Sequence, residues 1–111
     1  MKVISIVGDR QTGKSTLLAH YINDAQECGK KVLLVGRSIA MLKSFEREKN
    51  VRANGIKGQY LFATNNYFDI LAIEEDIRNI NSYLKIYGKY LKKDCLIIAT
   101  GDVDEKRTIE R

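Results

Sequence analysis

Residues 2–15 read KVISIVGDRQTGKS, and this stretch decides the fold of the chain. Its first part, Lys2–Val7, is rich in β-branched residues, which is typical of a short buried strand. The second part, residues 8–15, matches the pattern G-x-x-x-x-G-K-[ST]. Beyond it, apolar residues recur at helical spacing over 17–25, and Gly29 stands where a helix would end. The sequence therefore predicts a strand, a glycine loop and a helix.

The loop has the composition of a phosphate-binding site. Its two glycines allow backbone angles that turn successive N–H groups into a concave nest, and the helix N-terminus adds its positive end. Lys14 would reach the β- and γ-phosphates, and the Ser15 hydroxyl would ligate Mg²⁺. We expect ATP and Mg²⁺ here, bound by Gly8, Asp9, Arg10, Gln11, Thr12, Gly13, Lys14, Ser15 and Thr16. The alternative, a glycine turn that only joins a strand to a helix, is less favoured because the whole pattern is present.

The rest of the chain alternates in the same way. Further strands are expected at 31–35, 59–63, 70–73 and 95–99, and residues 47–57 are expected to form a loop. Helices are expected after Ser38, with an apolar side of Ile39, Leu42 and Phe45, and from Asp76 to about Leu91. Because each strand is apolar throughout, the pattern predicts one α/β domain over 1–111, with a mostly parallel sheet covered by helices on both faces.

Two acids, Glu74 and Glu75, directly follow the strand at 70–73. The carboxyl ends of parallel strands face the ligand crevice, so these acids should lie near the glycine loop. Glu74 would act on the metal side, and Glu75 would polarise a water for attack on the γ-phosphate. Two alternatives stay open. Both acids could have no role other than to complement the dipole of the next helix. Asp69, which precedes the strand, could instead be the metal-side acid.

The composition of the chain limits its possible partners, metal sites and location. A net charge of +5 favours an anionic partner such as nucleic acid, and the spacing of Cys28 and Cys95 and a single histidine fit no common metal cluster. Both thiols are expected to be reduced and structural. No stretch approaches the roughly 20 apolar residues that span a bilayer, and the N-terminus lacks a signal-peptide pattern. We therefore expect a cytoplasmic protein without membrane contact.

With these residues in place, the chain resembles the additional-strand, catalytic-glutamate branch of P-loop NTPases, which includes RecA-like ATPases, helicases and viral DNA-packaging motors. The order of segments is most similar to the ATPase core of superfamily 2 helicases and phage terminase large subunits. Four segments carry the resemblance: GDRQTGKS (8–15), VLLVGRSIAMLKSF (32–45), ILAIEE (70–75) and CLIIATGD (95–102). The first is the specific one.

The resemblance implies a three-layer P-loop NTPase fold and an incomplete site. Thr100 matches the polar residue that senses the γ-phosphate or couples hydrolysis to movement, although it could equally begin a turn with Gly101. In ring-forming relatives an arginine from a neighbouring subunit completes the site. The candidates here are Arg37, Arg78, Arg107 and Arg111. The resemblance thus implies a homo-oligomer or a partner subunit, and the minimal size indicates a viral or mobile-element protein.

Three functions stay open at this point: an ATPase that works on nucleic acid, a small-molecule phosphotransferase, and a nucleotide-binding regulator with little turnover. DNA or RNA could contact basic helix faces at Lys85, Lys89 and Lys92 and at Lys43, Arg47, Lys49 and Arg52, unless these are solvated surfaces. The aromatic residues Tyr60, Phe62, Tyr67 and Phe68 could pack in the core or stack on a base, and Tyr21, Phe45 and Tyr87 are expected in the core.

Overall fold

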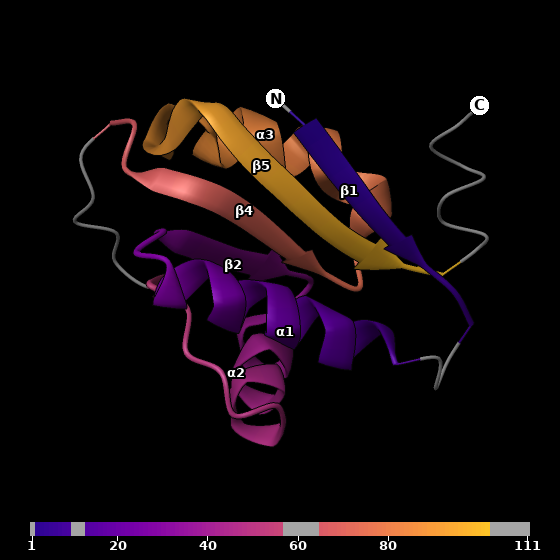
Figure 1. The fold of residues 1–111 in the computed structure, drawn as a ribbon. Helices are drawn as coiled ribbons and strands as arrows, with labels where there is room; N and C mark the ends of the chain where they lie inside the picture. The colour runs from indigo at the N-terminus through magenta and orange to yellow at the C-terminus, as the bar shows by residue number, and fades with distance from the viewer. Residues whose placement is uncertain (1, 10–12, 57–64, 103–111) are drawn as a thin grey trace.

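The computed structural model describes residues 2–9, 13–56 and 65–102, and these form a five-stranded parallel sheet with helices on both faces (Figure 1). The strands are β1 (Lys2–Val7), β2 (Val32–Gly36), β3 (Gly55–Ile56), β4 (Phe68–Glu74) and β5 (Leu91–Gly101). The helices are α1 (Lys14–Glu27), α2 (Ile39–Glu48) and α3 (Ile80–Tyr87), and the 3₁₀ turns η1 (Ile77–Asn79) and η2 (Gly88–Tyr90) flank α3. The strand order is β1-β5-β4-β2-β3. The predicted α/β class with a parallel sheet is confirmed.

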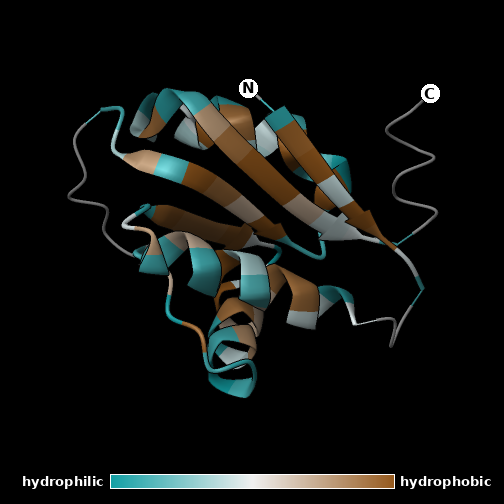
Figure 2. Cartoon of the chain, viewed as in Figure 1, coloured by the Kyte–Doolittle hydropathy of each residue, from teal (hydrophilic) through white to brown (hydrophobic). Residues whose placement is uncertain are grey.

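Two apolar clusters fill the two faces of the sheet. Successive residues of a strand point to opposite faces, so Leu34 of β2 faces α1 and α2, whereas its neighbour Leu33 faces α3. The first cluster takes Leu18, Ile22, Leu42 and Phe45 from α1 and α2. The second takes Ile77 and Tyr83 from η1 and α3. Figure 2 shows the strands as the most hydrophobic part of the chain, which is why each must be covered on both sides.

Local signals place the helix ends where the sequence predicts them. Gly13 adopts a positive φ of 81° just before α1, a conformation that favours glycine. The Ser38 hydroxyl accepts a hydrogen bond from the Met41 N–H at 3.2 Å and so caps α2. Gly29, with φ of 82°, turns the chain after α1. These helix ends therefore follow from ordinary capping chemistry.

Several boundaries differ from the prediction. The last helical segment ends before Leu91, because Leu91 pairs with Phe68 and is buried as the first residue of β5. Residues Gly55–Ile56, expected in a loop, form β3 beside β2. The strand expected at 59–63 lies outside the described residues. Tertiary pairing thus overrides local preference at these positions.

The burial of some residues also differs from the prediction. β1 is only partly buried because it lies at the edge of the sheet, and Tyr21 is exposed on α1. Phe45 is buried as expected, and Tyr87 is half-buried. Cys28 is exposed and Cys95 buried, both as free thiols. Among the described residues, no helix is long and apolar enough to cross a membrane.

Gly36 ends β2 at the point where α2 packs closest to the sheet. A Cβ atom there would lie 2.9 Å from Leu42 Cδ2 and 3.0 Å from the Glu74 carbonyl oxygen. We therefore expect Gly36→Ala to lower the free energy of unfolding by about 1–3 kcal/mol, measured by urea denaturation. Gly88→Ala is the control, because Gly88 has helical backbone angles and nothing lies within 4 Å of its added Cβ. A Gly36→Ala protein as stable as wild type would contradict this packing constraint.

Candidate functional site

The candidate site lies at the edge of the sheet where the parallel strands end. The pairs Val7 with Gly101 and Gly36 with Glu74 bring the ends of β1, β5, β4 and β2 to this edge. Parallel sheets carry their ligand crevices at this edge. At this edge the glycine loop leaves β1, α1 begins, and β4 ends in the acidic run that starts with Glu74.

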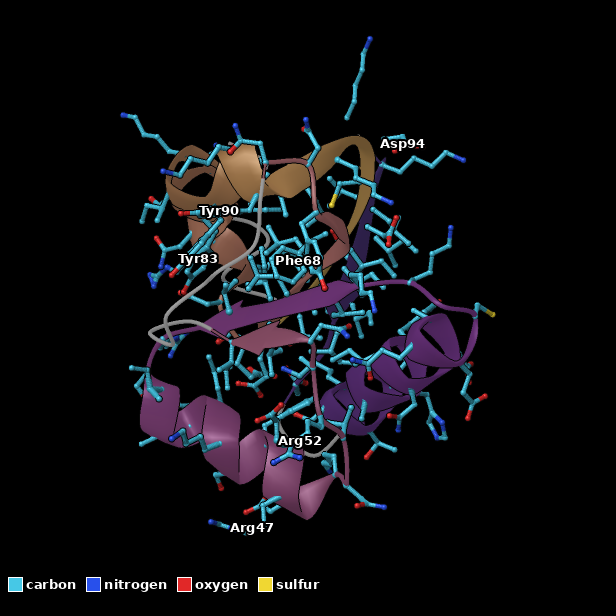
Figure 3. All side chains as sticks on the ribbon, turned by 90° about the vertical axis from the view of Figure 1, so that its left-hand side faces the viewer. Arg47, Arg52, Phe68, Tyr83, Tyr90 and Asp94 are labelled. Atoms are coloured by element: carbon cyan, nitrogen blue, oxygen red, sulfur yellow. The ribbon has the colours of Figure 1, made fainter. Side chains whose placement is uncertain are left out.

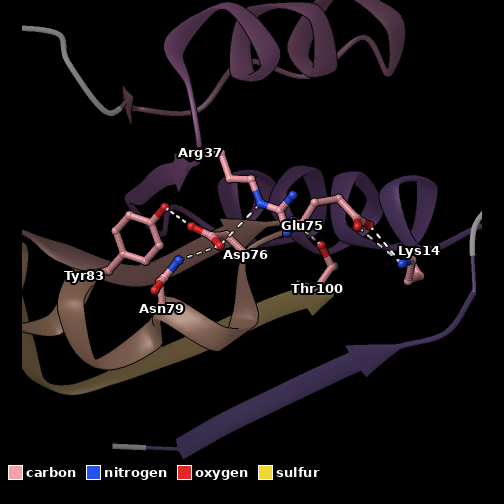
Figure 4. Close-up of polar contacts among 7 residues, drawn as sticks. All are labelled: Lys14, Arg37, Glu75, Asp76, Asn79, Tyr83 and Thr100. Carbon is pink, nitrogen blue, oxygen red and sulfur yellow. Dashed lines mark hydrogen bonds and ion pairs between the residues drawn. The ribbon is translucent and has the colours of Figure 1, made fainter. Parts of the chain in front are cut away.

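Lys14 makes the central contact of the site. Its side chain is only 7% exposed, and its Nζ atom lies 3.1 Å from Glu75 Oε1 and 3.2 Å from the Gly101 carbonyl oxygen (Figure 4). A lysine is seldom this buried without partners, because removing its charge from water is costly. The predicted proximity of the loop end and the acidic pair is therefore present, across 61 residues of sequence.

Ser15 and Glu74 form the second contact. The Ser15 hydroxyl donates to Glu74 Oε1 at 3.4 Å. A hydroxyl and a carboxylate are the oxygen donors that Mg²⁺ takes, so this donor set fits the metal. Among the described residues, no three His, Cys, Asp or Glu side chains group as metal ligands. A metal here would therefore take most of its ligands from phosphate oxygens and water, as Mg²⁺ commonly does.

The protonation of Glu74 is shifted by its surroundings. The pKa of Glu74 is raised to about 7, mainly by burial and to a smaller extent by repulsion from Glu75. The Ser15 hydrogen bond and the Arg37 charge oppose the shift. Near neutral pH, the carboxyl group is thus divided between its two forms. A bound cation would favour the carboxylate and release a proton.

Glu75 has a left-handed backbone conformation, with φ of 53°. For a residue other than glycine, this conformation costs on the order of 1 kcal/mol. Its N–H donates to Thr100 Oγ1 at 2.7 Å, so the buried Thr100 side chain holds the turn in place. Thr100 and Gly101 both belong to β5, so the interpretation of Thr100 as the start of a turn is wrong.

Asp76 was not recognised as a site residue in the sequence, where it only marks the start of a helix. It is 3% exposed and accepts hydrogen bonds from Tyr83 OH at 2.5 Å and Asn79 Nδ2 at 2.8 Å. Arg37 Nε lies 3.5 Å from the same carboxylate. The three consecutive acids at the end of β4 and directly after it thus each hold a different partner: Ser15, Lys14 and Arg37. The run EED was the only signal in the sequence.

Asp69, the alternative acid, lies away from Ser15 and Glu74. It lies within β4, not before it, and five strand residues place it about 16 Å from Glu74 at the other edge of the sheet. Its carboxylate accepts from the Lys31 N–H at 2.9 Å and pairs with Lys92 Nζ at 2.8 Å, and these contacts lower its pKa.

The other residues predicted for the site lie in different parts of the chain. Gly8 and Asp9 follow β1 toward the site, and the exposed Thr16 accepts a hydrogen bond from Lys49 Nζ at 3.1 Å. Arg78 is exposed on η1. Outside the described residues lie Arg10, Gln11, Thr12, Tyr60, Phe62, Arg107 and Arg111.

The two predicted basic faces differ. Lys43, Arg47 and Arg52 are exposed around α2 and the segment after it, where they line two adjoining hollows of about 530 and 550 Å³. Figure 3 shows Arg47 and Arg52 on this side of the molecule. The other face is not one helical stripe, because Lys92 lies in β5 and is paired with Asp69.

Of the four aromatic residues for which base stacking was the alternative to core packing, the structure describes Tyr67 and Phe68. Phe68 is buried at the start of β4, and Tyr67 contacts it edge-on at a centroid distance of 5.0 Å. These two rings therefore support the core interpretation.

No protein-family model matches this sequence, and no curated protein matches it either.

The raised pKa of Glu74 predicts a pH-dependent stability. The pKa of Glu74 is 4.5 in the unfolded chain and about 7 in the folded protein. As pH rises through this range, Glu74 ionises more readily in the unfolded chain than in the folded protein, so the free energy of unfolding falls. We expect Glu74→Gln to raise the free energy of unfolding by about 1–2 kcal/mol at pH 8 and to have little effect at pH 4.5. Urea denaturation at the two pH values measures this. Glu27→Gln, at an exposed position, is the control, and an equal gain at both pH values would contradict the shift.

Proposed function

We propose that this chain is a Mg²⁺-dependent ATPase of the P-loop NTPase class, acting in the cytoplasm and linked to work on nucleic acid. One observation carries the proposal: the last two residues of the glycine loop contact the acid that ends β4 and the acid that follows it. Lys14 pairs with Glu75, and Ser15 bonds Glu74. A glycine turn that only joined a strand to a helix would not require a buried lysine and two partly buried carboxylates at one edge.

The strand order supports the same class. β5 lies between β1, which leads into the glycine loop, and β4, which leads into the acidic run. One strand inserted between these two is in keeping with the additional-strand branch that the sequence resembles. The helices on both faces agree with a three-layer arrangement.

The contacts of Lys14 suggest how binding and hydrolysis are coupled. We infer that Lys14 exchanges the Glu75 carboxylate for a phosphate oxygen when the nucleotide binds, since a cation at this site attracts either anion. Glu75 is then released to accept the proton of the attacking water, and Thr100 fixes its backbone for that role. Bound Mg²⁺ would supply charge neutralisation at the phosphates, held by Ser15 and Glu74.

The link to nucleic acid rests on the exposed basic residues around α2. Lys43, Arg47 and Arg52 line the two adjoining hollows, and such groups bind phosphates without reading sequence. Assembly with further copies or a partner subunit remains part of the proposal, because the described residues form a single small lobe. A turnover rate per chain that rises with protein concentration would support assembly.

The proposed roles of Lys14 and Glu75 can be separated. Glu75→Gln should retain ATP binding and lose hydrolysis by about 10²- to 10³-fold, since it removes only the proton acceptor. Lys14→Ala should lose ATP binding with the fold intact by circular dichroism. Phosphate release and equilibrium binding of a fluorescent ATP analogue, each with and without DNA, measure both effects, and Glu27→Gln is the control. Full turnover in Glu75→Gln would assign Glu75 to the following helix instead.

A second candidate, a small-molecule phosphotransferase, is favoured by one cavity. A pocket of about 200 Å³ lies beside the site, lined by Ser15, Met41, Ser44, Phe45, Glu48, Lys49 and Glu74. Its apolar wall and its hydroxyl, carboxylate and amine groups suit a small hydroxylated acceptor, and two lining residues belong to the proposed metal site.

Product analysis distinguishes the two candidates. An ATPase should release one free phosphate for each ADP, whereas a phosphotransferase should form ADP without free phosphate when nucleosides or sugars are added. For the ATPase that we favour, Ser44→Leu should narrow the pocket and leave hydrolysis within about twofold of wild type, with exposed Ser82→Leu as the control. A labelled phosphorylated product that Ser44→Leu abolishes would instead establish the transferase.

A further inference from the structure

A hydrogen-bond network connects Arg37 to α3 at the rim of the site. Asp76 is nearly buried, and a buried carboxylate is stable only when donors satisfy it. Three groups donate to it: Tyr83 OH of α3, Asn79 Nδ2 of η1, and Nε of Arg37, which directly follows β2 (Figure 4). Burial and the contact with Asp76 raise the pKa of Tyr83, so the phenol stays a donor at neutral pH.

Arg37 lies where a second cation would meet a triphosphate. It directly follows Gly36, which is paired in register with Glu74. Figure 4 shows Lys14 and Arg37 on opposite sides of Glu75. The Arg37 side chain is 49% exposed, whereas its partner Asp76 is 4% exposed, so the guanidinium is accessible from solvent while its anchor is buried.

A second cation besides Lys14 would offset the negative charges at this edge of the sheet. Glu74 and Glu75 are both close to the position that the γ-phosphate would take beside Lys14, and each anion repels it. A guanidinium has five N–H donors in a planar fork, so it can hold Asp76 and a phosphate at the same time. A lysine at this position could not keep both contacts with the same geometry.

We propose that Arg37 binds the terminal phosphate of the nucleotide within its own chain, and that Asp76 and Tyr83 position it. This inference rests on the proposed ATPase function and adds a contact that distinguishes ATP from ADP. Arg37, one of the four arginines considered for a role across a subunit boundary, would then act in cis. Arg37 is then a binding residue, and Asp76 and Tyr83 are positioning residues that connect the phosphate site to α3.

Equilibrium binding of ATP and ADP tests the contact directly. Arg37→Ala should weaken ATP binding at least about tenfold and change ADP binding less than about twofold, because ADP lacks the terminal phosphate. Arg37→Lys should recover only part of the loss, and Lys30→Ala, which removes an exposed charge at the other edge of the sheet, should behave as wild type. Tyr83→Phe should reduce the preference for ATP with ADP binding unchanged, whereas a merely structural role would weaken both.

Mixing inactive variants tests whether Arg37 acts in cis. If it does, equal amounts of Arg37→Ala and Lys14→Ala should hydrolyse ATP no faster than the two proteins measured separately. If the Arg37 of a neighbouring copy completes the site instead, random assembly would restore about a quarter of the wild-type rate, and the proposal would be overturned.

The failure of this inference and that of the proposed function are distinguishable. If the wild-type chain binds neither nucleotide, the proposed function fails, and the role of Arg37 fails with it. If the wild-type chain prefers ATP and Arg37→Ala keeps the same preference, only the role of Arg37 is overturned.

Discussion

The parallel register of β1, β5, β4 and β2 is the constraint on which the rest of the structure depends. Because all four strands end at one edge, residues 14 and 75, far apart in sequence, meet as an ion pair. A shift of one residue between β4 and β5 would turn alternate side chains to the wrong face and separate Thr100 from the Glu75 N–H. Core packing therefore determines the geometry of the site as well as the stability of the sheet.

The sequence predicted the parts of this arrangement that rest on local signals. The first strand and the first helix followed from residues 2–29, and Glu74 and Glu75 were placed at the correct edge by the rule for parallel sheets. The strand order followed from no local pattern, because it depends on which buried surfaces fit together. The start of β5 at Leu91 was missed for the same reason, since its pairing with Phe68 opposes a continuing helical stripe.

The site residues divide in the same way. Lys14 and Ser15 were found through a motif, whereas Asp76 and its contact with Tyr83 could not be, because a carboxylate at the start of a helix is ordinarily exposed. Asp69 illustrates the reverse case: it was kept open as the metal-side acid and lies only five residues from Glu74 in sequence, yet a strand separates residues by about 3.3 Å each. Residues that are close in sequence along a strand can therefore lie far apart in space. Residues on different strands come close to one another only through the fold.

The position of β1 has a dynamic consequence. Within the described residues, β1 has a neighbour on one side only, β5, and none of its side chains is fully buried. Strands with few buried contacts open locally at a lower free energy than the whole domain. The lysine and serine of the site are instead anchored by α1, whose inner face belongs to the core. Local opening of β1 would therefore leave Lys14 and Ser15 in place on the helix, and the hydrophobic interior undisturbed.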